Sequence, residues 1–271
     1  MTKNDLGKKQ KMIARIQEFT LMDDDFMTRF FENDKECMQF VLQTILGNKN
    51  ITVIEEVAQK VVKSLEGRSV RLDVYAKDDT GKPYDIEIQR ADKGAGAKRA
   101  RYNSALMDAD ITVPGEDAKN LPESYVIFIT ENDIFGKGLP LYHIDRVVKE
   151  CNIPFGDENH IIYVNGKYEG DDPIGDLMHD FHCKKPADMK NKILADRARY
   201  LKEDDKGVKH MCRIMEDFAK EERDEAKIER TIEMAVKLLE LGKMTEEELI
   251  ETFNLTDEQM QTIKEKVSVL A

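Results

Sequence analysis

The sequence has no apolar run long enough to cross a membrane, because its 41% hydrophobic residues are interspersed with 35% charged residues. A membrane-spanning helix needs roughly 18 or more consecutive apolar residues. Residues 1–5 lead into a charged segment, without the apolar centre of a secretory signal. We therefore expect a cytoplasmic protein with no membrane partner.

Cysteine is scarce and dispersed. The four cysteines are Cys37, Cys151, Cys183 and Cys212. With no CxxC pair, they are interpreted as reduced thiols that are neither zinc ligands nor disulfide partners. The histidines are also scattered. His179 and His182 lie three residues apart and are possible ligands, but the neighbouring Asp176 and Asp180 favour a polar surface.

Positive charge is in deficit, with 42 Lys and Arg against 54 Asp and Glu, for a net charge of −12. Proteins that bind nucleic acid tightly usually carry a basic patch, because neutralised phosphates supply most of the non-specific affinity. An acidic total allows a local basic groove. It predicts weak, salt-sensitive binding to nucleic acid unless a partner or second subunit contributes.

The 271 residues suit one main domain with an appendage. Composition shifts to charged, helical sequence near Pro186, so we place a main domain at 1–185 and a helical C-terminal extension at 186–271. In the first part we expect one or two helices over 21–46, strands at 51–57, 70–76, 84–89, 124–130 and 160–165, and a helix over 97–110. In the extension, capping boxes at Thr245 and Thr256 predict helices at 246–253 and 257–268.

The most informative stretch is Val70 to Arg90, where two segments alternate apolar and polar residues. This period is that of paired strands, and the link between them is rich in turn residues. A three-residue loop ending at Gly81 places glycine where a left-handed conformation is favoured. The register that follows pairs Val74 with Ile86, so the apolar residues face each other.

The same register places Asp73 opposite Glu87, and Arg71 opposite Gln89. Facing carboxylates on paired strands repel each other unless a cation compensates them. Mg²⁺ is a hard ion that accepts one or two carboxylates and keeps water for chemistry, and Mn²⁺ is an alternative. An exposed amphipathic hairpin would show the same alternation, with Arg71 neutralising the acids, so both interpretations stay open at this point.

The order of these features resembles the PD-(D/E)XK nuclease superfamily, and more narrowly the PD-(D/E)XK nuclease family transposases, which are related to the recombination-promoting nucleases of bacteria. The matching segments are residues 71–76 with Gly81, 84–89, 98–104, and 125–129 with Phe135 and Gly136. The resemblance covers roughly residues 20 to 170. It implies an α/β, restriction-endonuclease-like core, a mixed sheet flanked by helices, followed by an all-helical extension.

The resemblance also implies a metal-dependent DNA endonuclease. Asp73 and Glu87 match its metal-binding acids, and Gln89 stands where the superfamily has lysine. Glutamine can orient an attacking water but cannot offset charge. An additional acid borne on a helix would be Asp25, Glu32 or Glu36.

Lys98, Arg99, Arg101 and Tyr102 follow the hairpin and are candidate DNA contacts, because such side chains bind phosphates. The alternative is a solvated helix face. The C-terminal helices have helix-turn-helix lengths, but the last begins with Asp257 and Glu258, acidic where it would approach phosphate. We interpret them as a structural or homo-oligomerising module.

Two other functions remain open. A catalytically degraded family member would act as a DNA-binding or assembly protein, which Gln89 favours. A hydrolase of small phosphate esters would share the carboxylates.

Overall fold

The computed structural model describes residues 3–62, 69–90, 92–112 and 115–270. The chain divides into two compact units, Met1–Met211 and Cys212–Ala271. This division lies further along the chain than the 185/186 boundary suggested by composition. The reason is that α6 (Lys192–Glu203) contacts α1 (Lys3–Glu18), α2 (Asp24–Phe31) and α3 (Lys35–Ile45) of the first unit.

A mixed six-stranded sheet forms the centre of the first unit, in the order β1-β2-β3-β4-β8-β5. Its strands are β1 (Val53–Val62), β2 (Val70–Asp78), β3 (Pro83–Gln89), β4 (Ser124–Thr130), β5 (Leu141–Ile144) and β8 (Asn159–Asn165). β1, β2 and β3 are successive antiparallel neighbours, whereas β3, β4 and β8 run parallel, and β5 returns antiparallel to β8. A separate two-stranded sheet contains β6 (Val147–Val148) and β7 (Ile153–Pro154).

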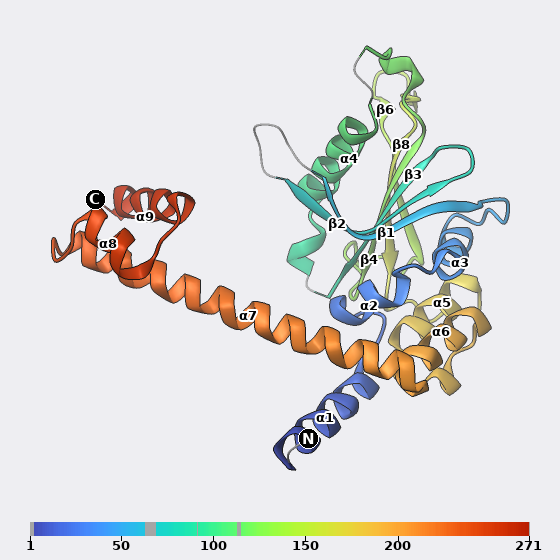
Figure 1. Cartoon of the computed structure of the whole chain (residues 1–271). Helices are drawn as coiled ribbons and strands as arrows, with labels where there is room; N and C mark the ends of the chain where they lie inside the picture. Colours follow the sequence, from blue (N-terminus) through green and yellow to red (C-terminus); the bar gives the residue numbers. More distant parts are fainter. Residues whose placement is uncertain (1–2, 63–68, 91, 113–114, 271) are drawn as a thin grey trace. The chain divides into compact units, whose positions relative to one another are not determined.

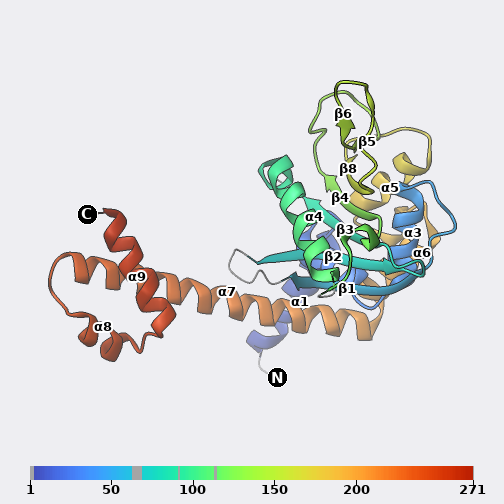
Figure 2. The ribbon, with the colours of Figure 1, turned by 90° about the horizontal axis from the view of Figure 1, so that it is seen from above.

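Helices cover both faces of this sheet. Helix α4 (Ala97–Ile111) lies along the strands in both ribbon views (Figures 1 and 2). Its Ala100 and Met107 pack in one cluster with Val126 and Phe128 of β4. The alternate residues Ile127 of β4 and Ile86 of β3 point to the other face and are also buried. Helices α2 and α3 pack on the edge strand β1, which α4 also contacts.

The remaining helices of the first unit follow the last strand. They are α5 (Pro173–His182) and α6, with a short 3-10 turn between them at Pro186–Asp188. Two further 3-10 turns, Asp92–Ala95 and Ala118–Asn120, lie between β3 and β4. Helix α7 (Asp205–Glu240) begins in this unit and ends in the next. The mixed sheet flanked by helices, with helices in the C-terminal part, confirms the predicted restriction-endonuclease-like α/β fold.

The predicted hairpin register is confirmed near the loop. Val74 pairs with Ile86 and Ala76 with Tyr84. Gly81 has a φ of 93°, the left-handed conformation that the three-residue loop requires. The Asp78 carboxylate closes the loop, because it accepts hydrogen bonds from the N–H groups of Thr80 and Lys82 and from the Tyr84 hydroxyl.

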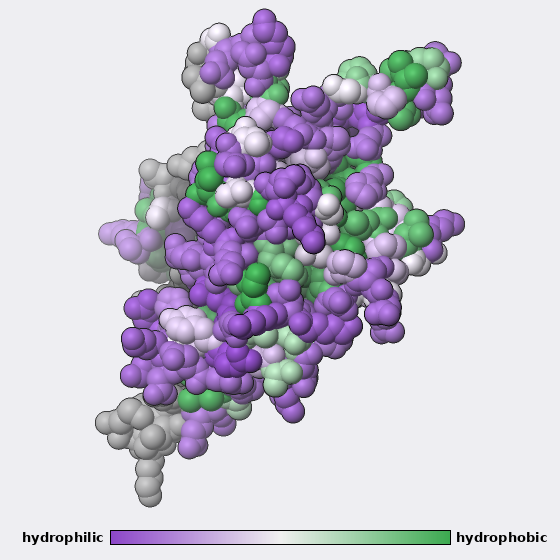
Figure 3. All heavy atoms as spheres, turned by 90° about the vertical axis from the view of Figure 1, so that its right-hand side faces the viewer, coloured by the Kyte–Doolittle hydropathy of each residue, from purple (hydrophilic) through white to green (hydrophobic). Residues whose placement is uncertain are grey.

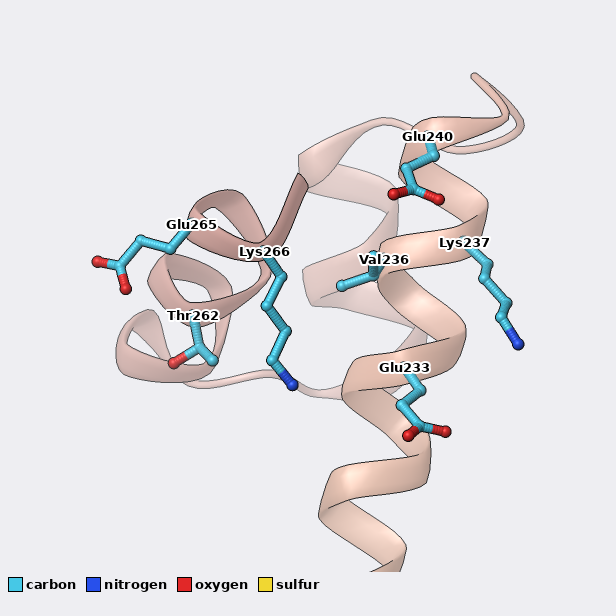
Figure 4. A pocket seen from close by; sticks show the side chains of 7 residues that line it. All are labelled: Glu233, Val236, Lys237, Glu240, Thr262, Glu265 and Lys266. Atoms are coloured by element: carbon cyan, nitrogen blue, oxygen red, sulfur yellow. The ribbon is translucent and has the colours of Figure 1, made fainter. Parts of the chain in front are cut away.

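The second unit is a small helical assembly. The end of α7 packs with α8 (Glu246–Phe253) and α9 (Asp257–Leu270) around an apolar cluster that includes Leu249 and Ile263. Both predicted capping boxes form, at Thr245 with Glu248 and at Thr256 with Gln259. A cavity of about 680 Å³ is lined by α7 and α9 residues, and Figure 4 shows Val236 directed toward α9.

No helix within the described ranges is long and apolar enough to cross a membrane. The face shown in Figure 3 is covered mostly by hydrophilic side chains, with small apolar areas between them. All four cysteines are free thiols.

Candidate active site

The candidate site lies where β2 and β3 separate. Their ladder runs from the Lys77–Pro83 pair to the Val74–Ile86 pair and ends there. The prediction that it continues through Asp73 and Glu87 as a strand pair is therefore wrong. Their side chains instead bridge the gap: Glu87 Oε1 accepts the Asp73 N–H at 3.4 Å, and Asp73 Oδ2 accepts the Ile88 N–H at 3.1 Å.

The two carboxylates are nevertheless brought together, as the sequence predicts. Each binds the backbone of the opposite strand, which fixes both groups at the strand junction. Burial raises the pKa of Asp73 to about 6. Burial first, and then the charge of Asp73, raises the pKa of Glu87 to about 7. Both carboxyl groups therefore ionise less readily than in water, and a nearby cation would favour their charged forms.

Asp85 adds a third acid beneath this pair. It is fully buried on β3, and burial together with the charges of Glu87 and Asp73 raises its pKa well above the usual value. Asn103 of α4 donates a hydrogen bond from Nδ2 to Asp85 Oδ2 at 3.3 Å, while Asp85 Oδ1 and Asn103 Oδ1 are buried without a partner. The raised pKa favours the protonated form of the Asp85 carboxyl, in which one oxygen becomes a hydrogen-bond donor.

Arg99 of α4 provides the positive charge closest to these acids. Its Nη2 donates to Glu87 Oε2 at 2.5 Å, and its Nη1 donates to the Gly94 carbonyl at 3.2 Å. The guanidinium lowers the pKa of Asp73, Asp85 and Glu87, but burial outweighs it at each. Arg99, which the sequence suggested as a DNA contact, therefore contacts the acid site directly, and its contact with DNA stays a prediction.

Gln89, the third residue of the predicted site, lies at the end of β3 against a close-packed glycine. A Cβ added to Gly94 would lie 1.7 Å from Gln89 Oε1, so only glycine fits there without displacing the Gln89 amide. The Gly94 carbonyl also accepts from Arg99. The Gln89 and Arg99 side chains therefore both contact Gly94.

The additional acid on a helix, expected at Asp25, Glu32 or Glu36, stays a prediction. The Asp25 side chain lies outside the described residues. Glu32 binds Arg29 at 2.9 Å, and Glu36 is exposed on α3. The helix acid whose charge raises the pKa of Asp73 is Asp24, at the first position of α2. Asp24 was not among the acids that the sequence suggested.

The other candidate DNA contacts lie on the solvent side of α4. Lys98 and Arg101 are exposed, and Tyr102 is 38% exposed. All three lie within three residues of Arg99 along the same helix. The positive charge is confined to the first part of α4, because Asp108 and Asp110 lie in its last turn.

A second group of potential metal ligands occurs at the end of α5. His179, Asp180 and Cys183 place ligand atoms within 4.8 Å of one another. Both Asp180 oxygens already accept backbone N–H groups, from Lys190 and Asn191 at 2.7 and 2.8 Å. Burial raises the pKa of the Cys183 thiol to about 11, and His182 bonds the Gly166 carbonyl. These contacts are structural and favour no metal there.

A mixed sheet with buried acids at a strand junction defines a protein of the restriction-endonuclease-like class. The family model of the PD-(D/E)XK nuclease family transposases matches residues 26–167, which is more than half of the chain, and the chain belongs to this family. Comparison with curated proteins and with solved structures found no match.

Proposed function

We propose that this chain is a metal-dependent DNA endonuclease, in which Asp73 and Glu87 bind Mg²⁺ or Mn²⁺ and Gln89 orients the attacking water. The observation that supports this most is the meeting of the Asp73 and Glu87 carboxylates at the junction of β2 and β3. Membership of a nuclease family supports the reaction class.

The residues present fit a hard divalent cation. Their donors are carboxylate oxygens, which such ions prefer. Burial raises the pKa of all three acids although Arg99 is beside them, so one guanidinium does not balance their charge. A divalent ion would supply the missing positive charge. When bound, it would acidify a water and stabilise charge on a phosphoryl oxygen.

Within this proposal the chain's own groups have distinct tasks. Asp73 and Glu87 hold the ion, while Asp24 at the start of α2 extends the acidic side of the site. Gln89 presents an amide that can orient a water but carries no charge. We assign the charge normally supplied by the motif lysine to Arg99, whose guanidinium already contacts Glu87 at 2.5 Å.

We further propose DNA as the substrate, approached over the exposed basic side chains of α4. Lys98 and Arg101 would bind backbone phosphates, and Tyr102 would hydrogen-bond to one. With a net charge of −12, affinity should be modest and strongly dependent on salt. Self-association through the C-terminal helices, which would present two such surfaces to one duplex, belongs to the same proposal.

A second candidate function is a DNA-binding or assembly protein without nuclease activity. It is favoured by the ion pair between Arg99 and Glu87, because a guanidinium on a ligand carboxylate competes with a metal. Gln89 in place of a lysine points the same way. Retention of two apposed acids, Asp73 half-buried and Glu87 buried, costs stability unless they serve a function, and this favours the enzyme.

Nicking of supercoiled plasmid in the presence of Mg²⁺ or Mn²⁺ separates these functions. Asp73→Asn and Glu87→Gln should each abolish metal-dependent nicking while leaving the fold intact. Asp79→Asn is the matched control, because Asp79 is an exposed acid in the loop of the same hairpin. Cleavage that survives in both site variants would refute the assignment. Hydrolysis of a small phosphate ester but not of plasmid would indicate a different substrate class.

A further inference from the structure

The strand β1 carries an unusual backbone conformation directly opposite Asp73. Ala58 pairs with Val74 and Lys60 with Leu72, so Gln59 and Asp73 occupy facing positions between two regular pairs. Gln59 has a φ of 55°, in the left-handed region. The register is the same on both sides of this position, so the irregularity is confined to one residue.

Left-handed backbone is costly for a residue with a long side chain, and glycine or asparagine would adopt it more readily. Such conformations persist only where the surrounding structure enforces them, and they are enriched at functional sites. Within a strand, a left-handed residue also redirects its side chain away from the usual alternation. At Gln59 this redirection directs the side chain toward Thr28 of α2.

The Gln59 amide connects two parts of the site. Its Nε2 donates to Thr28 Oγ1 at 3.1 Å, and its side chain is close enough to the Asp73 carboxylate to lower the pKa of that group by hydrogen bonding. Thr28 is buried on α2, the helix that begins with Asp24. The amide therefore links a candidate metal ligand to the helix that carries the additional acid.

We propose that Gln59 is a positioning residue of the acid site, held left-handed so that its amide fixes the Asp73 carboxylate against α2. This inference rests on the proposed function, because it concerns the site that binds the ion. Groups that bond to a metal ligand orient it, and their loss typically lowers metal affinity by about 10- to 100-fold. A residue that only stabilised β1 would have no such effect.

The test compares Mn²⁺ affinity with thermal stability in the full-length chain. Gln59→Gly removes the amide and also relieves the strained backbone. We expect its unfolding temperature to equal or exceed that of the wild type, while Mn²⁺ affinity, followed by electron paramagnetic resonance of the free ion, falls about 10-fold. Gln59→Asn, which tolerates the left-handed region and keeps an amide, should retain more affinity than Gln59→Gly.

Asn33 supplies a matched control. It is also left-handed, with a φ of 57°, and its N–H bonds Glu56 rather than a site acid. Asn33→Gly should leave Mn²⁺ affinity unchanged. Thr28→Val, which removes the anchor of the amide with little change of shape, should reduce affinity less than Gln59→Gly does.

The outcomes distinguish this inference from the proposed function. If the wild type binds Mn²⁺ and Gln59→Gly binds it equally well, the positioning role is wrong and the metal site stands. A Gln59→Gly protein that loses stability together with affinity would show a structural role and overturn the inference. A wild type without Mn²⁺ affinity would overturn both the inference and the metal site.

Discussion

Metal affinity should depend steeply on pH, because the two proposed ligands must ionise before they bind a cation. Burial raises the pKa of Asp73 to about 6 and that of Glu87 to about 7. Both values lie above those of ordinary carboxyl groups. The protonated forms therefore dominate as pH falls through this range, and affinity increases as pH rises.

The magnitude follows from the two ionised fractions. Treated as independent groups, both acids are ionised in about 90% of molecules at pH 8 and in about 1% at pH 5.5. Apparent affinity for Mn²⁺ should thus decrease about 100-fold between these pH values. At pH 6.5 the two groups together hold about one proton, which binding must release; at pH 8.5 they hold almost none.

Isothermal titration calorimetry in two buffers with different ionisation enthalpies measures both quantities. We expect about one proton released per ion at pH 6.5 and none at pH 8.5. Glu87→Gln should remove most of the release at pH 6.5, because Glu87 has the higher pKa. Affinity that is constant from pH 5.5 to 8 would refute the reasoning.

Three further predictions concern stability. Mg²⁺ at ten times its dissociation constant should add about 1.4 kcal/mol and raise the unfolding temperature by about 3–5 °C, whereas Asp73→Asn should show no shift. Burial raises the pKa of Glu56 to about 7, so its ionisation destabilises the folded state as pH rises from about 4.5 to 7. Glu56→Gln should then gain about 1–2 kcal/mol in urea unfolding at pH 8 and nothing at pH 4, and an equal gain at both would contradict this. Lys202 is buried and donates to the carbonyls of Phe19 and Lys184, so Lys202→Met should cost about 3 kcal/mol, and a loss below about 1 kcal/mol would contradict that role.

Much of the hairpin could be predicted from sequence because its signals are local. Alternation with period two fixes which residues share a face, and Gly81 fixes the loop. From these two features the sequence predicts that Asp73 and Glu87 lie close together. They could not reveal that the β2–β3 ladder ends at the Val74–Ile86 pair. Beyond this pair the strands separate, and the Asp73 carboxylate accepts the Ile88 N–H in place of a backbone carbonyl.

The parts of the site that sequence missed depend on tertiary packing. Arg99 contacts Glu87 because of how α4 is rotated on the sheet. The neighbouring Lys98 and Arg101 are also basic, but they face solvent. The left-handed Gln59 has no sequence signal, since glutamine does not favour that conformation. Asp24 lies in a run of three aspartates, and the sequence alone does not indicate which of them influences Asp73.

The tight turn at Gly81 also bears on how the molecule assembles. Asp73 and Glu87 are only 14 residues apart along the chain, and hairpins of this kind form within microseconds. Arg99 lies 12 residues beyond Glu87, so it is synthesised after both acids and reaches Glu87 only when α4 docks on the sheet. The two acids can therefore approach each other in the nascent chain before Arg99 is available to pair with Glu87, and a cation present during synthesis would offset their repulsion at that stage.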